Sequence, residues 1–365
     1  MATEKPEKLN RVSIVIGDEE DESTGRIGDF FGFWSDVEIK RSIDDYSQVS
    51  FSAPFEPERA EFRETFRPFS FKRLECLINL EPRFTGMIVN VDPPLKPEER
   101  RVTVTGYSRP AVYTDVTAPV GSKLEFQGFT LRQIADAIGK PFGIGVDVIG
   151  DDTGTPFKKV KLDADKKIQE FLADLAKQRN LVIADTWDGR QLFWRSIEPG
   201  RPRARFVEGE APLGKVTPKF DPQNYYSDVT GFGKRKKGYG PSKWTAHNHW
   251  LEAPRRPLTF KLEDSERADV PEATLARLGR MFANMASWTI EDLPGWRDNY
   301  GEIWEPNTTI ALKAPSAMIY NEVELLIRDV TLRQTANVES ATLEVVLPGA
   351  FNGKIPTFLP WDEVA

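Results

Sequence analysis

The stretch WSDVEIKRSIDDYSQVSFSAP, residues 34–54, decides the fold predicted for this chain. Val37 and Ile39 alternate with charged residues, and a second run that ends near Phe51 alternates with serines. A period of two is typical of half-buried strands, and the polar residues 42–47 between the runs are typical of a turn. The sequence therefore predicts a β-hairpin with one buried face.

The hairpin lies inside a predicted first β-domain, residues 9–118. Residues 12–16 form a short apolar strand pattern, and the acidic residues 17–32 are predicted to form an exposed loop. Residues 55–67 are charged and show no clear period. Further strand patterns complete the domain, at residues 74–80, 87–91 and 101–105.

The hydrophobic period changes over residues 119–200, which predicts a small α/β insert. Thr130 and Gln133 form a capping-box pattern ahead of an apolar stripe with helical spacing. A second helix is predicted over about 164–178, with Asp163 as its N-cap. Short strand patterns complete the insert, at residues 142–148, 181–184 and 191–195.

A second β-domain is predicted over residues 201–257 and 258–350. It contains a helix at about 271–288 with an apolar stripe, and residues 238–257 are predicted to form a long loop. The C-terminal tail, 351–365, contains Pro, Phe and Trp and is a candidate for packing on a neighbour. The strand patterns of this domain lie at residues 216–220, 227–232, 258–262, 308–313, 323–332 and 341–347.

The two β-domains share a pattern of strand, turn, strand, long turn and strand. The matching segments are 75–80 with 308–313, 86–91 with 325–330, and 102–105 with 343–346. This predicts two related β-domains in one chain. Three such chains would present six near-equivalent units in a ring.

Composition excludes several classes of protein. With 49 basic and 56 acidic residues the formal net charge is -7, which is not typical of a general nucleic-acid binder. The single cysteine, Cys76, excludes an internal disulfide. The N-terminus has no apolar signal region, and no run reaches the roughly 18 apolar residues that span a bilayer. We therefore expect a chain made in the cytoplasm, without a membrane anchor.

No catalytic, cofactor-binding or metal site is predicted. His247 and His249 form a His-x-His pair, but no third ligand lies nearby in the sequence, so an exposed aromatic loop is the simpler interpretation. The candidates for contact with a neighbouring subunit or with the lumen of a ring are a basic run and two tryptophans. They are Lys234, Arg235, Lys236, Lys237, Trp244 and Trp250.

The chain resembles the baseplate hub proteins of Mu-like phages, a family also related to the hubs of T-even phages and to type VI secretion spikes. The resemblance covers nearly the whole sequence. It rests on residues 34–44, 84–88, 102–108, 113–118, 129–135, 141–144, 295–296 and 301–307. The acidic residues 18–22 and the segment 234–257 depart from the family pattern.

The resemblance implies a mainly β, multidomain protein with two β-barrel-like tube domains and a small α/β domain. It implies a homotrimeric hub of the virion's tail baseplate that joins the sixfold tail tube to the threefold central spike. The expected partners are the tail tube protein, the spike protein and other baseplate proteins, and DNA only in passage. Assembly would occur in the host cytoplasm, and no residues are implied to be catalytic.

Two alternatives stay open at this stage. A tail-tip protein can carry a cell-wall hydrolase, and the abundant carboxylates do not exclude a catalytic pair. A glycan-binding adhesin would use exposed tryptophans, for which Trp244, Trp250, Trp296 and Trp304 are candidates.

Overall fold

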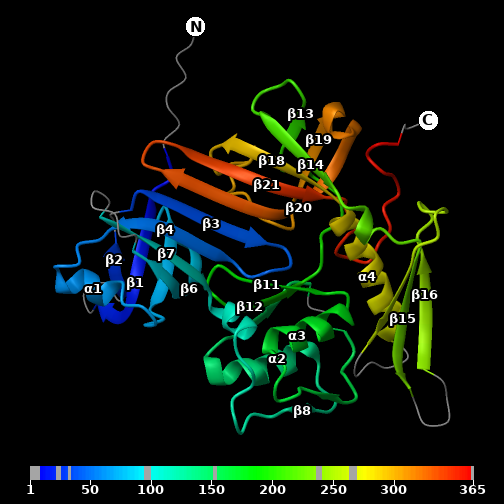
Figure 1. Ribbon diagram of the computed structural model, residues 1–365, viewed down its shortest axis with the longest axis horizontal. Coiled ribbons are helices and arrows are strands. Elements are labelled where there is room, and N and C mark those ends of the chain that lie inside the picture. Colours follow the sequence, from blue (N-terminus) through cyan, green and yellow to red (C-terminus); the bar gives the residue numbers. More distant parts are fainter. Residues whose placement is uncertain are drawn as a thin grey trace.

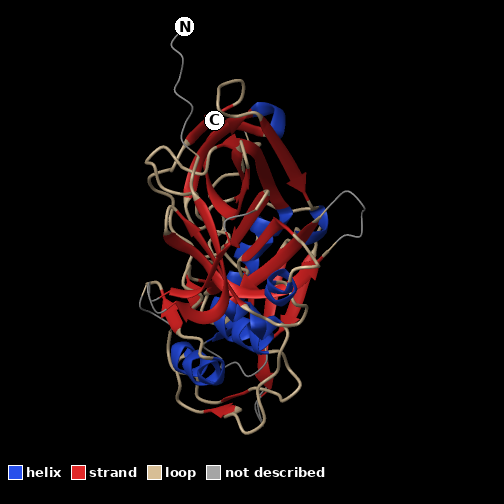
Figure 2. Cartoon of the chain, turned by 90° about the vertical axis from the view of Figure 1, so that its left-hand side faces the viewer, coloured by secondary structure: helices blue, strands red, loops and turns tan. Residues whose placement is uncertain are grey.

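The chain is mainly β and multidomain, with its strands in several sheets (Figure 1), as the sequence predicts. The helices lie among the strands, and the larger ones are in the centre and lower half of the view (Figure 2). No helix among the described residues is long and apolar enough to cross a membrane. The computed structural model describes residues 9–21, 26–31, 34–93, 100–150, 154–235, 241–262 and 269–362.

The first β-unit forms the left-hand part of Figure 1. It contains β1 (Val12–Asp21), β2 (Arg26–Phe31), β3 (Asp36–Ser42), β4 (Gln48–Pro54), α1 (Ala60–Thr65), β5 (Arg73–Ile78), β6 (Glu81–Asp92) and β7 (Arg101–Ser108). The strands lie in the order β3-β4-β7-β6-β5-β1-β2. The predicted hairpin of residues 34–54 is confirmed, because β3 pairs with β4 and both bury their apolar residues.

Two segments of this unit differ from the prediction. Residues 17–32 are not one loop, since β1 continues to Asp21 and pairs with β2. A strand at the edge of a sheet is held by main-chain hydrogen bonds to its neighbour, so an acidic sequence can still form such a strand. Residues 55–67 contain α1, which buries no residue and therefore lacks an apolar stripe in the sequence.

The insert has its own hydrophobic core, built mainly from α2, α3 and the strands beside them. Its elements are η1 (Arg109–Thr114), β8 (Glu125–Phe126), α2 (Leu131–Gly139), η2 (Lys140–Phe142), β9 (Val146–Val148), β10 (Val160–Lys161), α3 (Ile168–Lys177), β11 (Val182–Asp185) and β12 (Gln191–Trp194). The capping box of Thr130 and Gln133 is confirmed. The Asp163 cap is wrong, because the N-cap of α3 is Lys167, which makes no side-chain cap hydrogen bond.

The second β-unit has the strand order β14-β18-β21-β20, with β19 and β13 beyond β20. These strands are β13 (Arg205–Val207), β14 (Lys215–Phe220), β18 (Ala286–Pro294), β19 (Thr309–Ala314), β20 (Ile319–Thr335) and β21 (Glu339–Val346), with η4 (Pro315–Ala317) between β19 and β20. Trp288 of β18 and Ile327 of β20 are fully buried in the shared core.

A subdomain interrupts this unit between β14 and β18. It comprises η3 (Pro222–Asn224), β15 (Asp228–Arg235), β16 (Pro241–His247), β17 (Pro257–Lys261) and α4 (Asp269–Met285). The prediction of a loop at residues 238–257 is therefore wrong in part, since β16 lies within this range and pairs with β15. The tail packs on its own chain, where Trp361 contacts Trp288 and Phe220.

The two β-units are joined by pairing between β3 and β20. Seven residue pairs, from Asp329↔Ser42 to Thr335↔Asp36, link strands almost three hundred positions apart in the sequence. Ile39 and Leu332 meet in this pairing and are both buried. The described strands of both units thus form one open thirteen-stranded sheet, without closing into a barrel.

The two units repeat the same strand order. In the first unit β3-β4-β7-β6-β5 are neighbours, and in the second β14-β18-β21-β20-β19 are neighbours in that order, with every pair antiparallel. The next strands differ, because β1 is antiparallel to β5 whereas β13 is parallel to β19. The long middle strand carries a β-bulge at the same place in each, between Ile88 and Asn90 and between Ile327 and Asp329. The predicted match of 86–91 with 325–330 agrees with these bulges.

The other two predicted matches are out of register. Arg73 pairs with Met87 as Thr309 pairs with Leu326, so the match of 75–80 with 308–313 is shifted by three residues. The match of 102–105 with 343–346 is shifted by two, because Gly106 and Val345 hold equivalent places. A period of two leaves a shift of two residues undetected. β5 and β19 are buried at several consecutive positions, so their apolar pattern does not fix the register.

We expect Ile39→Ala to lower the free energy of unfolding by about 2–5 kcal/mol, because it leaves a cavity where the two units meet. Lys40→Ala, at the next position and exposed, is the control and should change it by less than about 0.5 kcal/mol. Denaturant unfolding measures both variants. Equal effects would contradict the placement of Ile39 in the shared core.

Candidate assembly interface

Eight neighbouring strands, β14-β18-β21-β20-β3-β4-β7-β6, present one continuous polar face. The residues on this face lie opposite one another from strand to strand and are mostly Ser, Thr and charged side chains. They include Lys215, Thr217, Lys219, Ser287, Thr289, Glu291, Asp329, Thr331, Arg333, Glu344, Asp36, Glu38, Lys40, Ser50, Ser52, Thr103, Thr105, Asn90 and Asp92. The opposite face covers the apolar core.

Charges on the polar face are paired across strands. Arg333 of β20 binds Glu38 of β3 across the joint between the units, and Lys40 binds the same carboxylate. Lys215 of β14 binds Glu291 of β18 at 2.8 Å. Hydrogen bonds from Lys215 and Thr217 hold the pKa of Glu291 below its usual value. The face therefore carries both signs and has few isolated charges.

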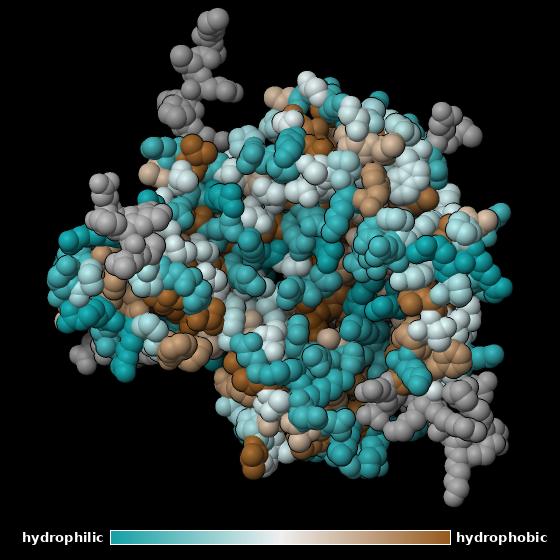
Figure 3. Space-filling model, viewed as in Figure 1, coloured by the Kyte–Doolittle hydropathy of each residue, from teal (hydrophilic) through white to brown (hydrophobic). Residues whose placement is uncertain are grey.

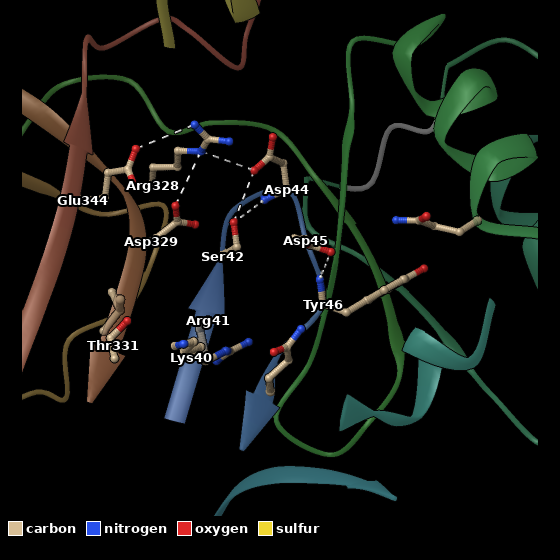
Figure 4. A pocket seen from close by; sticks show the side chains of 13 residues that line it. Lys40, Arg41, Ser42, Asp44, Asp45, Tyr46, Arg328, Asp329, Thr331 and Glu344 are labelled. Atoms are coloured by element: carbon tan, nitrogen blue, oxygen red, sulfur yellow. Dashed lines mark hydrogen bonds and ion pairs between the residues drawn. The ribbon is translucent and has the colours of Figure 1, made fainter. Parts of the chain in front are cut away.

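A pocket of about 560 Å³ lies on this face, where β3 meets β20. Arg328 stands at one side of it, 3.7 Å from Asp44, 3.6 Å from Asp329 and 3.8 Å from Glu344 (Figure 4). Lys40 lines another part of the same pocket. This arrangement is a charge network that ties the β3–β4 turn to β20 and β21.

Burial raises the pKa of Asp329 to about 6. The nearby carboxylates of Glu344 and Asp44 act in the same direction, whereas Ser42 and Arg328 oppose the shift. The side chain therefore titrates closer to neutrality than an ordinary aspartate.

The insert docks on both units next to this joint. Trp187, in the turn between β11 and β12, donates from Nε1 to Glu305 at 3.0 Å. Its ring packs under the guanidinium of Arg41, 3.6 Å from the ring centroid, and Arg83 lies 5.3 Å away. Arg41 also donates to the Asp185 carbonyl at 2.8 Å. One side chain of the insert thus contacts the first and the second β-unit.

A buried ion pair attaches the insert to α4. Arg179 Nη1 lies 2.6 Å from Asp269 Oδ1, and both side chains are almost completely inaccessible to solvent. Arg179 also donates to the Thr155 carbonyl and stacks over Phe157. Removing either charge would leave the other buried without its partner, so this contact fixes the position of the insert.

The predicted contact residues that the structure describes are in the subdomain between β14 and β18. Lys234 and Arg235 are in β15, and Lys236 and Lys237 fall outside the described residues. Trp244 and Trp250 are partly buried against the main core, and Trp250 Nε1 donates to the Pro356 carbonyl at 2.8 Å. Their role as interface or lumen contacts stays a prediction.

The structure brings the two histidines to different partners. His247 Nδ1 lies 2.6 Å from Asp228 Oδ1, whereas the His249 ring packs on Trp250. Among the described residues no group of three potential metal ligands converges. Trp296 and Trp304 are buried, so the expectation that they form an exposed glycan-binding surface is wrong.

The sequence held one overlooked signal for the joint. Arg41 follows Val37 and Ile39 at the same phase of β3, so a strand pattern already places it on the buried side. A charged side chain in such a position needs a partner. Its partners are Ser47 of the same unit and, in the insert, Asp185 and Trp187. Asp185 and Trp187 carry no comparable signal, since their contacts are with distant segments.

We expect Asp329→Asn to gain stability relative to the native chain as pH rises from about 4 to 7. The folded-state pKa of Asp329 lies above the unfolded value near 3.9. Between these two pKa values the folded state binds more protons than the unfolded state, so the native chain loses stability as pH rises, whereas the asparagine variant does not. Thermal unfolding of both proteins across this pH range tests it. A difference that does not change with pH would refute the perturbed carboxyl.

We expect Trp187→Ala to loosen the insert, because it removes contacts to both β-units. Limited proteolysis should then cut faster in the connecting residues 115–124 and 196–204 than in the native protein. Trp187→Phe keeps a ring under Arg41 but loses the hydrogen bond to Glu305, so it should be intermediate. Unchanged cleavage of the alanine variant would show that the insert is held elsewhere.

Comparison with known proteins shows which proteins the chain is similar to. Residues 112–195 match the second domain of gp44-like baseplate hub proteins. The baseplate hub protein gp44 of Escherichia phage Mu is 22% identical over 325 residues, covering 84% of this chain and 82% of that protein.

Two solved structures share the fold. The 43 kDa tail protein of prophage MuSo2 from Shewanella oneidensis has a TM-score of 0.74 at 21% identity and covers 93% of this chain and 99% of its own. The tail protein from Neisseria meningitidis MC58 has a TM-score of 0.76 at 15% identity, covering 95% and 99%. The predicted resemblance to Mu-like baseplate hub proteins is thereby confirmed: the chain is similar in sequence to one of them and shares the fold of two tail proteins.

Proposed function

We propose that three copies of this chain form a ring that joins the sixfold tail tube to the threefold central spike. The observation that carries this proposal is the repeated strand order, with a bulge at the same place in both units. Two equivalent units per chain allow a trimer to offer six similar contacts to a hexameric tube and three to a spike. The tube, the spike and other baseplate proteins are the proposed partners, in the tail baseplate of the virion after assembly in the host cytoplasm.

The polar face of the eight central strands is proposed to line a channel for DNA. Neighbouring strands are about 4.8 Å apart. Three chains with eight strands each would therefore close a cylinder whose backbone-to-backbone diameter is at least about 37 Å. Side chains take about 5 Å on each side, which leaves room for duplex DNA. Because its charges are mixed and paired, this face would hold phosphates weakly.

The proposed division keeps residues 9–118 and 201–350 as the tube domains and 119–200 as the insert. The role we propose is structural, without a catalytic step, in line with relatives that are baseplate and tail proteins. Cell-wall hydrolysis and glycan binding by Trp244 or Trp250 remain the alternatives. Clearing of peptidoglycan by the purified protein would favour the hydrolase.

The purified protein should have a native mass three times that of the 41.3 kDa chain. Native mass spectrometry over a range of concentrations measures this directly. Because each chain supplies two units, the ring should close at three chains, without a ladder of larger species. A monomer at every concentration, or a dimer, would contradict the proposed function.

A further inference from the structure

We infer that the outer edges of β6 and β14 pair with each other between two copies of this chain, in the register that β20 and β3 use within one chain. This inference rests on the proposed function, because it names the subunit contact of the ring. Within a chain, β20 and β3 join the second unit to the first. The same joint, made by β6 and β14, would join the first unit of one chain to the second unit of the next.

Both edges are available in the described part of the chain. β14 is the last strand in the sheet order and pairs only with β18 there. Beyond Ile88, β6 pairs only with β7 among the described strands. The N–H of Val91 donates to its neighbour, the side chain of Asn90, at 3.1 Å, as expected for a main-chain donor with no strand beside it. In the second unit the equivalent edge, from Asp329 onward in β20, is paired with β3.

The internal joint fixes the register of the proposed one. Asn90 and Asp329 are equivalent, because each follows the shared bulge. Lys215 and Asp36 are equivalent, because each lies at the start of its strand opposite the same position of its partner. Transferring the β20–β3 register then gives the opposing pairs Asn90 with Asp221, Val91 with Phe220, and Asp92 with Lys219.

Chemistry and main-chain direction agree with this register. Asp92 and Lys219 carry opposite charges on the polar face, a favourable cross-strand pair. The N–H of Asp221 donates to the Met285 carbonyl, on the β18 side, so the N–H and C=O of Phe220 point to the outer edge. Phe220 is 44% exposed, so its side chain can pack against Val91, which lies opposite it in the proposed register.

Prolines set the length of the proposed joint. Pro93 and Pro218 come next in the same register, and neither has an N–H to donate. Pairing therefore stops after three residues, against seven at the internal joint. The subunit joint is thus weaker in main-chain bonds and needs contacts beside the strands.

An exposed apolar segment next to β6 supplies such a contact. Phe71 and Asn307 hold equivalent positions before β5 and β19 and share a left-handed backbone, with φ of 49° and 61°. The insert covers Asn307, whose side chain accepts from the Ile197 N–H and donates to the Arg195 carbonyl. Phe69 and Phe71 are instead 87% and 54% exposed. Apolar patches also show at this end of the molecule, where α1 lies (Figure 3).

The cover for these phenylalanines comes from the neighbouring chain. The subdomain between β14 and β18 takes the place that the short turn 43–47 has between β3 and β4. At the internal joint this turn touches β20, where the Ile43 N–H donates to the Arg328 carbonyl. The subdomain of the neighbour would therefore lie beside β6, next to Phe71.

Disulfide trapping tests the register. A chain with Asp92→Cys and Lys219→Cys should, on oxidation, give covalent dimers and a closed trimer on non-reducing gels. The native Cys76 is buried, which raises its pKa to about 12, so it should not react. Each single variant should stay monomeric on the gel. Asp92→Cys with Thr217→Cys, on the same face but two residues out of register, is the matched control and should cross-link poorly.

A second set of variants tests the charge pair. Asp92→Lys should lower the trimer fraction in native mass spectrometry, and adding Lys219→Asp should restore it. A native trimer that neither cross-links through positions 92 and 219 nor responds to the charge exchange would overturn this joint and leave the ring standing. A chain that stays monomeric in all forms would overturn the joint and the proposed function together.

Discussion

The structure depends on the antiparallel pairing of β3 with β20. Main-chain hydrogen bonds between these strands, and the burial of Ile39 against Leu332 beneath them, turn two separate β-units into one sheet. Both strands would otherwise expose unpaired main-chain groups, which is unfavourable and invites wrong partners. Within the chain this contact is favoured, because covalent linkage gives the two strands a high effective concentration.

Several contacts near the joint stabilise it. The insert places Trp187 between Arg41 of the first unit and Glu305 of the second. The Arg328 network ties the β3–β4 turn to β20 and β21 on the polar face. The Arg179–Asp269 pair holds the insert to α4. Such linked contacts make the angle between the two units a fixed property of the chain, which a ring requires.

Local features were predictable from sequence, and long-range ones were not. Alternation predicted the β3–β4 hairpin, and the Thr130 capping box predicted α2, because neighbours in sequence determine both. The β3–β20 pairing joins strands far apart in the chain, and strand patterns do not reveal partner or register. The same limit explains the matches shifted by two and three residues. Of the candidate site, only the inward phase of Arg41 could have been found. The resemblance to a hub family includes residues 34–44 but assigned none of them to the joint.

The central claim is that the two units of each chain are equivalent members of one ring. Electron imaging of the purified assembly tests this most directly. The account predicts end-on views with six similar lobes around an open channel, alternating between first and second units. Rings in which the two units lie at different radii, or particles with one chain each, would contradict it.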